Sequence, residues 1–369
     1  MKNRTHFNNL VRYYAKRLDL WLYLKTRDAR SASGLKNKLK GKTHVPLTKE
    51  QRKSIDALWK GKKFDYQWFL FYNSLITNQS VEDNHYPIEW YIPNDFYYSK
   101  IDPYFNQVTV GRALDDKNLY DLLFKGVNQP RSIGHIINGV VHDSDYRKSG
   151  KRELMDECKK NGRVIFKPSI GTVGGKGIAF WNCVNNTLEQ LEDIIKGYKN
   201  AIVQEVVKQS PTLAQLHPTS LQTVRIMTLY AAGETSVVSV VLRMGRGNAQ
   251  VDNVSAGGIA VGVDETGKLR KYGYDVNGNR FDRHPTTDVP FEGIQIPSFD
   301  KCCDMVKYLA PRLGRTQRMI SWDLSIDEKE TPVLIEANLT YGQLDFHQMC
   351  NGPLFKDRIV ELLNQIENT

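Results

Sequence analysis

Two carboxylates and an amide lie close together near the end of the chain, on what is predicted to be a β-hairpin. Hydrophobic alternation predicts strands over 320–326 and 332–337, joined by a short polar loop. Asp323 lies on the first strand, while Glu336 and Asn338, two residues apart on the second, point to the same face. Such oxygens converging in a core repel one another unless a hard cation joins them, and Mg²⁺ prefers these ligands. We therefore predict a magnesium site, against the alternative of isolated strand-end carboxylates that face solvent.

Two arginines lie on strands that are otherwise rich in β-branched residues. Arg225 is within the predicted strand 222–231, and Arg243 ends the predicted strand 235–243. A guanidinium buried in a sheet needs an anionic partner. The pair could hold a phosphate or a substrate carboxylate in bidentate fashion. The alternative is that each arginine makes a salt bridge at the surface.

A glycine-rich loop follows a predicted buried strand over 163–168. Lys167 stands at the end of that strand, and Pro168 fixes the backbone that aims it. The loop contains Gly171, Gly174, Gly175 and Gly177, which let a backbone approach a phosphate and donate N–H groups to it. The stretch fails the Walker A pattern, because Ile170 stands at the first glycine position and Gly177 at the Ser/Thr position. It reads as strand, loop and strand, so we predict a phosphate-binding hairpin; the alternative is a flexible loop.

The elements that position these residues alternate between short strands and helices. Strands are predicted over 133–137, 139–142, 163–168, 177–181, 201–206, 222–231, 235–243, 257–263, 320–326 and 332–337. Helices are predicted over 149–161, 187–196, 298–313 and 353–367, with Ser298 as an N-cap, and Thr48 is predicted to cap a helix that runs to about Leu75. Because the strands come in hairpin-like pairs, we predict an α+β fold with antiparallel sheets rather than a doubly wound sheet.

The basic charge of the chain is concentrated in an N-terminal arm. The net charge is +10 over 369 residues, and residues 1–63 alone hold 18 Lys/Arg against 4 Asp/Glu. Residues 1–24 read as a basic amphipathic helix, which could lie on an anionic membrane surface or pack on its own domain. Residues 32–42 read as a solvated linker. No recognised nucleic-acid motif accompanies the charge, so we expect no nucleic-acid partner.

The cysteines and the absence of long apolar runs indicate the cellular compartment in which the protein is expected. The five cysteines are odd in number and fit no disulfide or metal spacing. No apolar stretch in the sequence is long enough to span a bilayer, and no secretory signal is evident. We therefore expect a reduced, cytoplasmic protein, for which peripheral association with the inner membrane face through residues 1–30 is a further hypothesis.

Six motifs, in order, resemble the sugar-transfer-associated ATP-grasp family. They are Asp116-Lys117-Asn118, the loop from Lys167 to Gly177, Val203-Gln204-Glu205, Thr223-Val224-Arg225, Gly257 to Gly262, and Trp322-Asp323 with Glu336-Ala337-Asn338. The resemblance covers the chain from about Thr48 to its end. It implies a fold that clasps ATP between two α+β lobes, with a basic helical arm and linker over 1–47, a helical region over 48–115, an N-lobe over 116–200 and a C-lobe over 201–369.

The resemblance also implies roles for individual residues. The residues implied to bind nucleotide are Lys117, Lys167, Ser169, Gly174, Gly175, Lys176, Gly177, Gln204, Glu205 and Val207, with the lysines on phosphates and the segment 204–207 at adenine. Arg225 and Arg243, with Lys167, would act on the transferred phosphate, and Asp323, Glu336 and Asn338 would carry one or two Mg²⁺. One departure is that the family fold usually places an acid just beyond the adenine segment, and residues 208–213 contain none.

The implied activity is ATP-dependent carboxylate–amine ligation through an acyl-phosphate. The family name suggests surface-polysaccharide synthesis, with a sugar carboxylate such as a uronic acid as acceptor and an amine or amino acid as donor. Two alternatives remain open at this point. One is a sugar kinase of the same fold, for which Asp252 or His347 could serve as base; the other is a non-catalytic nucleotide-binding partner of glycosyltransferases. His347 could also be a residue packed in a turn.

Overall fold

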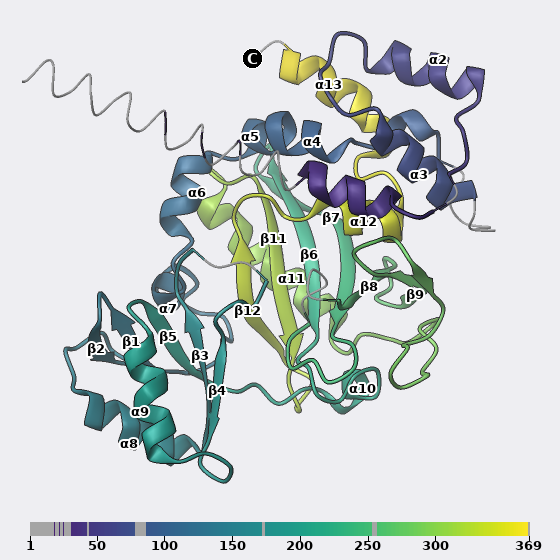
Figure 1. The fold of residues 1–369 in the computed structure, drawn as a ribbon. Helices are drawn as coiled ribbons and strands as arrows, with labels where there is room; N and C mark the ends of the chain where they lie inside the picture. The colour runs from purple at the N-terminus through teal and green to yellow at the C-terminus, as the bar shows by residue number, and fades with distance from the viewer. Residues whose placement is uncertain are drawn as a thin grey trace, which may run out of the picture. The chain divides into compact units, whose positions relative to one another are not determined.

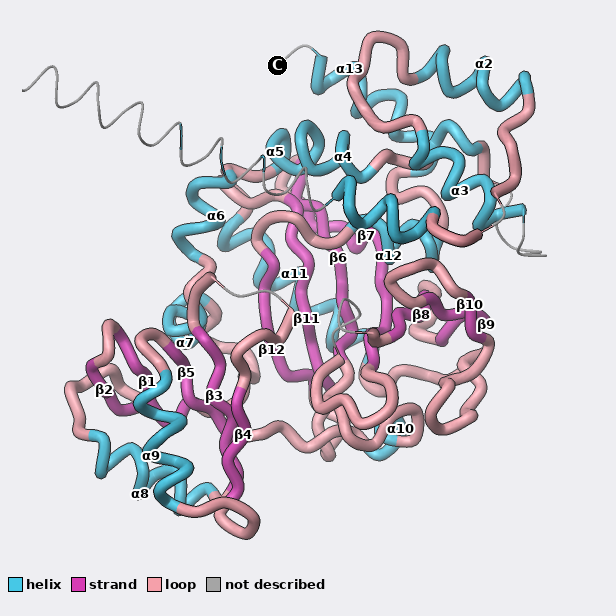
Figure 2. The backbone as a smooth tube through the Cα atoms, viewed as in Figure 1, coloured by secondary structure: helices cyan, strands magenta, loops and turns pink. Residues whose placement is uncertain are grey.

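The computed structural model divides the chain into two compact units, which are described separately (Figures 1 and 2). The first unit comprises residues up to Thr109 together with Gly352–Thr369, and the second comprises Val110–Asn351. The structure describes residues 18, 22, 25, 31–42, 44–77, 86–171, 174–252 and 257–367. The predicted arm over 1–24 therefore lies outside the described residues, apart from Leu18 and Leu22, which are exposed.

The first unit is helical. Its longer helices are α2 (Lys49–Leu58), α3 (Gln67–Thr77) and α13 (Ile359–Glu367). Shorter turns connect them: η1 (Ile88–Trp90), α4 (Asn94–Phe96), η2 (Tyr97–Ile101), α5 (Asp102–Phe105) and η5 (Lys356–Arg358), with α6 (Val108–Leu114) leading into the second unit. Thr48 caps α2 as predicted, in a capping box with Gln51. Among the described helices, none is long and apolar enough to cross a membrane.

Two predictions for this unit are wrong. The predicted single helix from Thr48 to Leu75 is broken into α2 and α3, because Gly61 takes a left-handed φ of 78° and Asp65 accepts a hydrogen bond from the backbone N–H of Gln67. The predicted linker 32–42 is helical over 31–39. In this helix Leu35 is buried, and the Lys38 ammonium lies 5.5 Å from the centre of the Phe71 ring. The two residues are three apart and therefore lie on the same face of the helix, which packs on the protein although the lysine-rich composition of the segment suggests a solvated linker.

The second unit contains a five-stranded antiparallel sheet with the order β2-β1-β5-β3-β4. Its strands are β1 (Ser132–Ile137), β2 (Val140–Asp143), β3 (Arg163–Pro168), β4 (Ala179–Asn182) and β5 (Ala201–Glu205). Helices α8 (Lys151–Asn161) and α9 (Leu188–Gly197) cover one face (Figure 1), where Val164, Phe166 and Trp181 form the core. Strands β3 and β4 pair as the predicted hairpin. The opposite face carries Lys167, because side chains alternate along β3.

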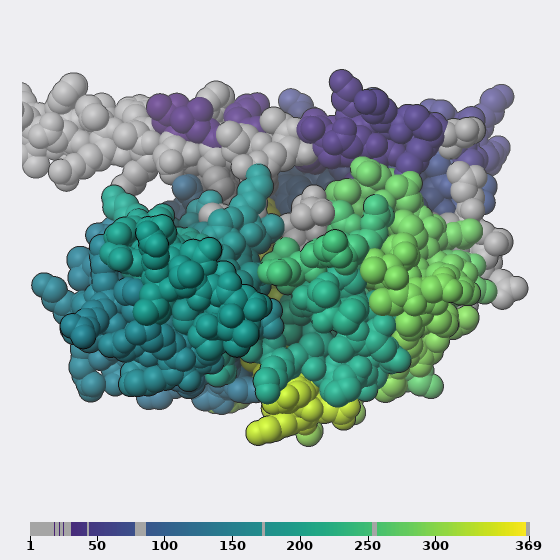
Figure 3. Space-filling view, turned by 60° about the horizontal axis from the view of Figure 1, so that its bottom comes forward, coloured from purple at the N-terminus to yellow at the C-terminus, as the bar shows by residue number. Residues whose placement is uncertain are grey.

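The second unit also contains a seven-stranded antiparallel sheet with the order β10-β9-β8-β7-β6-β11-β12. Its strands are β6 (Thr223–Ala231), β7 (Glu234–Met244), β8 (Ile259–Val263), β9 (Leu269–Tyr274), β10 (Arg280–Phe281), β11 (Met319–Ile326) and β12 (Pro332–Asn338). The predicted hairpin of β11 and β12 is confirmed. In the space-filling view the teal residues around the first sheet and the green residues around the second form two masses that lie side by side (Figure 3).

The two faces of the seven-stranded sheet differ in chemistry. Helix α11 (Phe299–Leu313) packs on the face where Ile226, Leu242 and Trp322 are buried. Helix α12 (Leu344–Asn351) packs over β7, β8 and β9 and is joined to Ser239 of β7 by hydrogen bonds. Because Ser239 is odd-numbered on β7, α12 shares its face with Arg243 rather than with Leu242.

The remaining elements are short or were not predicted. They are η3 (Lys117–Leu119), α7 (Tyr120–Leu123), α10 (Pro211–Ala214), β9, β10 and α12. The predicted N-cap at Ser298 is wrong: its φ is 52°, and its hydroxyl donates to the carbonyl oxygen of Glu330 at 2.6 Å rather than accepting from the helix. The helix itself is confirmed as α11. The domain boundaries predicted from the sequence stay a prediction.

Candidate functional site

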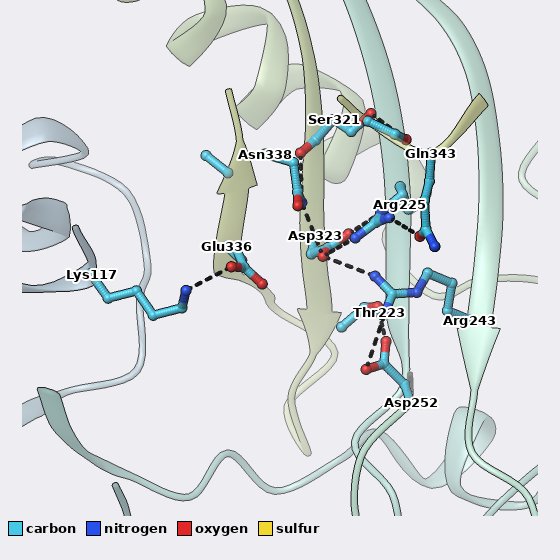
Figure 4. A network of polar contacts seen from close by, with 12 residues as sticks. Lys117, Thr223, Arg225, Arg243, Asp252, Ser321, Asp323, Glu336, Asn338 and Gln343 are labelled. Atoms are coloured by element: carbon cyan, nitrogen blue, oxygen red, sulfur yellow. Dashed lines mark hydrogen bonds and ion pairs between the residues drawn. The ribbon is translucent and has the colours of Figure 1, made fainter. Parts of the chain in front are cut away.

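A cluster of charged side chains lies on one face of the seven-stranded sheet, the face that carries Arg225, Arg243 and Asp323 (Figure 4). Strand register creates it: Asp323 of β11 is paired with Arg225 of β6 on one side and with Glu336 of β12 on the other. Directly paired residues in antiparallel strands place their side chains on the same face. Arg243 of β7 joins them, since it lies two residues from the partner of Arg225. Four strands, which belong to two hairpins far apart in sequence, thus deliver two carboxylates and two guanidinium groups to one place.

Asp323 is held by both arginines. Arg225 donates from Nε to Oδ1 and from Nη2 to Oδ2, each at 2.7 Å, and Arg243 donates from Nη1 to Oδ2 at 3.0 Å. All three side chains are nearly inaccessible to solvent. Burial alone would raise the pKa of Asp323, but the two guanidinium groups hold it at about 2. Asp323 is therefore ionised, and its charge is compensated within the protein.

A second carboxylate lies on the other side of Arg243. The Oδ1 of Asp252 is 3.6 Å from Arg243 Nη2, and its Oδ2 accepts a hydrogen bond from the Thr223 hydroxyl. Burial raises the pKa of Asp252, with Arg243 opposing and the nearby Asp323 carboxylate adding to the rise. The two arginines thus sit in a row of alternating charges, with an acid at each end of Arg243 (Figure 4).

Glu336 is paired with a lysine from a separate turn. Lys117, at the start of η3, places its Nζ 2.7 Å from Glu336 Oε1. Burial would lower the pKa of Lys117, yet the Glu336 carboxylate raises it. Conversely, burial would raise the pKa of Glu336, and Lys117 lowers it. The pair is charged, and it joins the turn after α6 to the edge strand β12.

The three residues predicted to hold magnesium are close together. Asp323 and Glu336 are register partners, and Asn338 donates from Nδ2 to Asp323 Oδ2 at 3.3 Å and to the carbonyl oxygen of Ser321 at 3.2 Å. Among the described residues no group of three His, Cys, Asp or Glu side chains could hold a metal. The donor set at this place would instead consist of two carboxylates and the amide oxygen of Asn338. This set fits a hard divalent cation. In the structure Asp323 is paired with two arginines and Glu336 with a lysine.

Lys167 lies on the open face of the five-stranded sheet. Its Nζ donates to Gln204 Oε1 at 3.1 Å, and Gln204 Nε2 donates to the carbonyl oxygen of Pro130 at 3.2 Å. Burial, together with the like charge of Lys117, lowers the pKa of Lys167 to about 8, although Glu336 opposes that shift. Lys167 is hydrogen-bonded to a neutral amide, so it has an ammonium group without a carboxylate in direct contact.

The glycine-rich loop between β3 and β4 has the backbone that its sequence predicts. Four glycines, Gly171, Gly174, Gly175 and Gly177, all take left-handed φ values between 72° and 75°. Gly174, Gly175, Lys176 and Gly177 are exposed. The Tyr198 hydroxyl donates to the carbonyl oxygen of Gly177, which ties the end of the loop to the sheet. At the other end Ser169 is fully buried, and its Oγ has no partner within the described part of the chain.

The segment predicted to meet adenine, residues 204–207, comprises the last two residues of β5 and the two that follow it. Gln204 is buried, whereas Glu205 accepts a hydrogen bond from the backbone N–H of Arg131 at 3.0 Å and lies 3.6 Å from its Nε. Val207 is half-buried beyond the end of the strand. All the predicted site residues lie in the second unit. Their predicted roles stay predictions.

His347 is buried, but it lies on helix α12 and not in the turn that was its alternative placement. Its Nδ1 is 2.8 Å from Ser239 Oγ, and its Nε2 has no partner among the described residues. Burial and the nearby arginines lower its pKa to about 3, so it is a neutral imidazole. A neutral ring in this position is ill suited to draw a proton from a substrate at neutral pH, because its conjugate acid is far too strong.

Three neighbours of the cluster were missed by the sequence reasoning. Gln343, from the loop before α12, accepts from Arg225 Nη1 at 2.5 Å. Asp115 lies near Lys117 and Glu336, and burial raises its pKa to about 6 despite the lysine. Ser321 shares the face of Asp323, which alternation along β11 could have shown; no local pattern marks Gln343 or Asp115.

The arrangement can bind an anion and a cation side by side. Lys117, Arg225 and Arg243 lie among the carboxylates of Asp252, Asp323 and Glu336 (Figure 4). Lys167 is a fourth basic group, which interacts electrostatically with Glu336 and Asp252. A bound polyanion would draw the basic groups away from the carboxylates, which would then be free for a divalent cation.

Comparison with solved structures finds distant likenesses. The ADP complex of purK, an N5-carboxyaminoimidazole ribonucleotide synthetase, has a TM-score of 0.41 at 11% identity, covering 66% of this chain and 50% of that one. D-cycloserine synthetase DcsG gives 0.42 at 13%, covering 70% and 73%. D-alanyl-alanine synthetase A from Vibrio cholerae O1 gives 0.38 at 13%, covering 72% and 64%. The chain thus spans half the length of the first of these proteins.

No curated protein sequence matches the chain. A family model does: the one described as sugar-transfer associated ATP-grasp matches residues 94–368, which is most of the chain. The predicted α+β ATP-grasp fold is confirmed, and the chain belongs to the sugar-transfer associated ATP-grasp family.

Proposed function

We propose that the protein is an ATP- and Mg²⁺-dependent carboxylate–amine ligase that forms an amide through an acyl-phosphate. The observation that supports this most directly is the charge cluster, in which Asp323 and Glu336 are each held by basic side chains. A site for phosphoryl transfer needs fixed positive charge and metal-binding oxygens rather than a nucleophilic side chain. The cluster supplies both.

Each set of residues would have a distinct task. Asp323, Glu336 and Asn338 would hold one or two Mg²⁺, which when bound would neutralise phosphate charge. Lys117 and Lys167 would bind the α- and β-phosphates under the loop 169–177. Arg225 and Arg243 would contact the transferred phosphate, and the segment 204–207 would meet adenine. The 204–207 segment begins at the end of β5, where Gln204 shares the open face with Lys167.

The proposed reaction requires little proton transfer. The acceptor carboxylate is already ionised, so its oxygen attacks the γ-phosphorus and ADP leaves. The amine then attacks the acyl carbon, the C–O bond to phosphate breaks, and the amine proton leaves with inorganic phosphate. Rate acceleration would come from alignment and from charge neutralisation.

The acceptor is proposed to be a sugar carboxylate, such as a uronic acid, and the donor an amine or amino acid. The family description supports a role near sugar transfer, and hence in surface-polysaccharide (capsule or O-antigen) synthesis. The loops over 209–219, 244–256 and 270–295 are expected to contact these substrates.

A sugar kinase of the same fold is the second candidate, but neither residue proposed as its general base is well suited to that role. Asp252 already accepts from Thr223 and faces Arg243, and His347 is a buried neutral ring. A non-catalytic role is disfavoured because the predicted metal ligands are close together.

One assay separates these reactions. With ATP, Mg²⁺, hydroxylamine and candidate uronic acids, we expect ADP together with a hydroxamate, because hydroxylamine captures an acyl-phosphate. The Asp323→Asn variant should lose both products by about a hundredfold or more, since a buried charge site is dismantled. A phosphosugar without hydroxamate from the wild-type protein would establish the kinase instead.

Nucleotide binding should depend on pH through Lys167. Its pKa of about 8 is depressed, so the free protein loses this proton as pH rises above 8, whereas a bound phosphate favours the charged form. We expect Mg·ADP affinity to fall by up to about tenfold between pH 8 and 9, with proton uptake near pH 8.5. Isothermal titration calorimetry in buffers of different ionisation enthalpy measures both quantities.

The matched control is Lys167→Arg, because arginine stays charged throughout this range. Its affinity should be flat over the same pH interval. An equal slope in this variant would assign the titration to another group and contradict the role of Lys167.

We also propose that the basic arm docks the protein on an anionic membrane surface and that the rest is cytoplasmic. Truncation of residues 1–30 should reduce co-sedimentation with vesicles containing anionic lipid, because much of the surplus positive charge of the chain precedes residue 64. Vesicles of neutral lipid serve as the control. Unchanged co-sedimentation of the truncated protein would sink the docking proposal.

A further inference from the structure

The turn that carries Lys117 is held by a buried asparagine. Asn118, the next residue, is 3% exposed. Its Oδ1 is 2.9 Å from His135 Nδ1, and its Nδ2 donates to the carbonyl oxygen of Ile136 at 3.4 Å. Its backbone N–H donates to the side chain of Asp116 at 2.9 Å. Both polar ends of this amide are therefore bound to strand β1.

The direction of these hydrogen bonds follows from their acceptors. The Ile136 carbonyl can only accept, so the amide nitrogen of Asn118 faces it and the amide oxygen faces His135. His135 Nδ1 must then carry the proton that Asn118 accepts. His135 is fully buried, and burial lowers its pKa, although the Asp121 carboxylate, 3.7 Å from its Nε2, opposes that shift.

A tyrosine clamps the same residue from the turn after β2. The Tyr146 hydroxyl donates to the backbone oxygen of Asn118 at 2.6 Å. Its ring stacks on that of His135, with centroids 4.2 Å apart and planes at 16°. Tyr146 takes a left-handed φ of 63°, a conformation that costs free energy for a residue other than glycine. The surrounding contacts maintain this strained backbone, and the hydroxyl bond to Asn118 is among them.

The rest of the turn is attached to two other parts of the second unit. The backbone N–H of Lys117 donates to the carbonyl oxygen of Ser169, the first residue after β3, at 2.9 Å. The Tyr120 hydroxyl donates to the carbonyl oxygen of Ala337 at 3.2 Å and accepts from its N–H at 3.3 Å. Ala337 follows Glu336, the partner of Lys117. The backbone of Lys117 is thus fixed between the glycine loop, β12 and β1.

We propose that Asn118, His135 and Tyr146 form a positioning clamp that fixes the backbone of Lys117, so that its ammonium can reach both Glu336 and the phosphate of a bound nucleotide. A lysine side chain has four rotatable bonds and loses much conformational freedom on binding, so a mobile backbone would weaken its phosphate contact further. None of the three clamp residues contacts Glu336 directly in the structure. The inference rests on the proposed nucleotide-binding role of Lys117.

The test is a double-mutant cycle on nucleotide affinity, with Mg·ADP as the probe in isothermal titration calorimetry. Lys117→Ala should weaken binding by about tenfold or more, and Asn118→Ala and Tyr146→Phe by about tenfold and threefold, respectively. If the clamp acts through Lys117, Asn118→Ala should weaken binding little further in the Lys117→Ala background. His142→Ala is the matched control: it removes a half-buried histidine of the edge strand β2 that is paired with His135 and makes its hydrogen bond to the Val140 carbonyl oxygen.

The outcomes separate the clamp from the role of Lys117 itself. Binding unchanged by Lys117→Ala would contradict the proposed phosphate site. Weakened binding in Lys117→Ala with no change in Asn118→Ala and Tyr146→Phe would overturn only the clamp. Additive losses in the double variant would assign Asn118 a general structural role and also overturn it. Tyr146→Phe keeps the ring stack, so it provides the comparison if thermal unfolding shows that Asn118→Ala is poorly folded.

Discussion

Asp323 accepts hydrogen bonds from two buried arginines, and the rest of the site depends on that balance of charge. An ionised carboxylate or guanidinium removed from water is costly unless an opposite charge compensates it. In the seven-stranded sheet the strand register provides this compensation, because β6, β7, β11 and β12 each bring one charged residue to the same face. The order of strands β7-β6-β11-β12 therefore sets both the packing of the sheet and the sequence of charges across it.

On the proposed function, the same balance would give the site two states. Without ligand, Lys117 neutralises Glu336, and Arg225 and Arg243 neutralise Asp323. A nucleotide triphosphate offers the basic groups a stronger set of anionic partners, and Mg²⁺ offers the carboxylates a cation. Binding is then an exchange of partners in which no charge is left alone. Lys167 differs, because its present partner is the neutral amide of Gln204 and its pKa is depressed.

Much of this site could be predicted from the sequence, because alternation along a strand determines which residues share a face. The hairpin of β11 and β12 and the common face of Glu336 and Asn338 follow from that rule, whereas Asp323 is brought opposite Glu336 by a register shift between Asp323 and Leu324. The β3–β4 hairpin follows from glycines at positions that need a left-handed backbone. The arginines could be assigned to strands, but pairing with Asp323 depends on the register between β6 and β11, which is not local.

The residues that were missed act through contacts between distant segments. Asn118 was visible only as part of a motif, and its partners His135 and Tyr146 come from β1 and from the turn after β2. Helix 31–39 was read as a linker because its lysines dominate its composition, whereas Leu35 and Lys38 are buried. Strands β9 and β10 lie in a polar stretch with weak alternation; β9 is held by pairing with β8, and β10 by pairing with β9.

The most direct test of this account is a crystal structure of the protein with Mg²⁺ and a non-hydrolysable ATP analogue. The account predicts Mg²⁺ at about 2.0–2.1 Å from oxygens of Asp323, Glu336 and Asn338, with the Lys117 ammonium moved from Glu336 to a phosphate oxygen. A complex in which the nucleotide is bound while Lys117 still pairs with Glu336, and the metal lies away from these three residues, would contradict it.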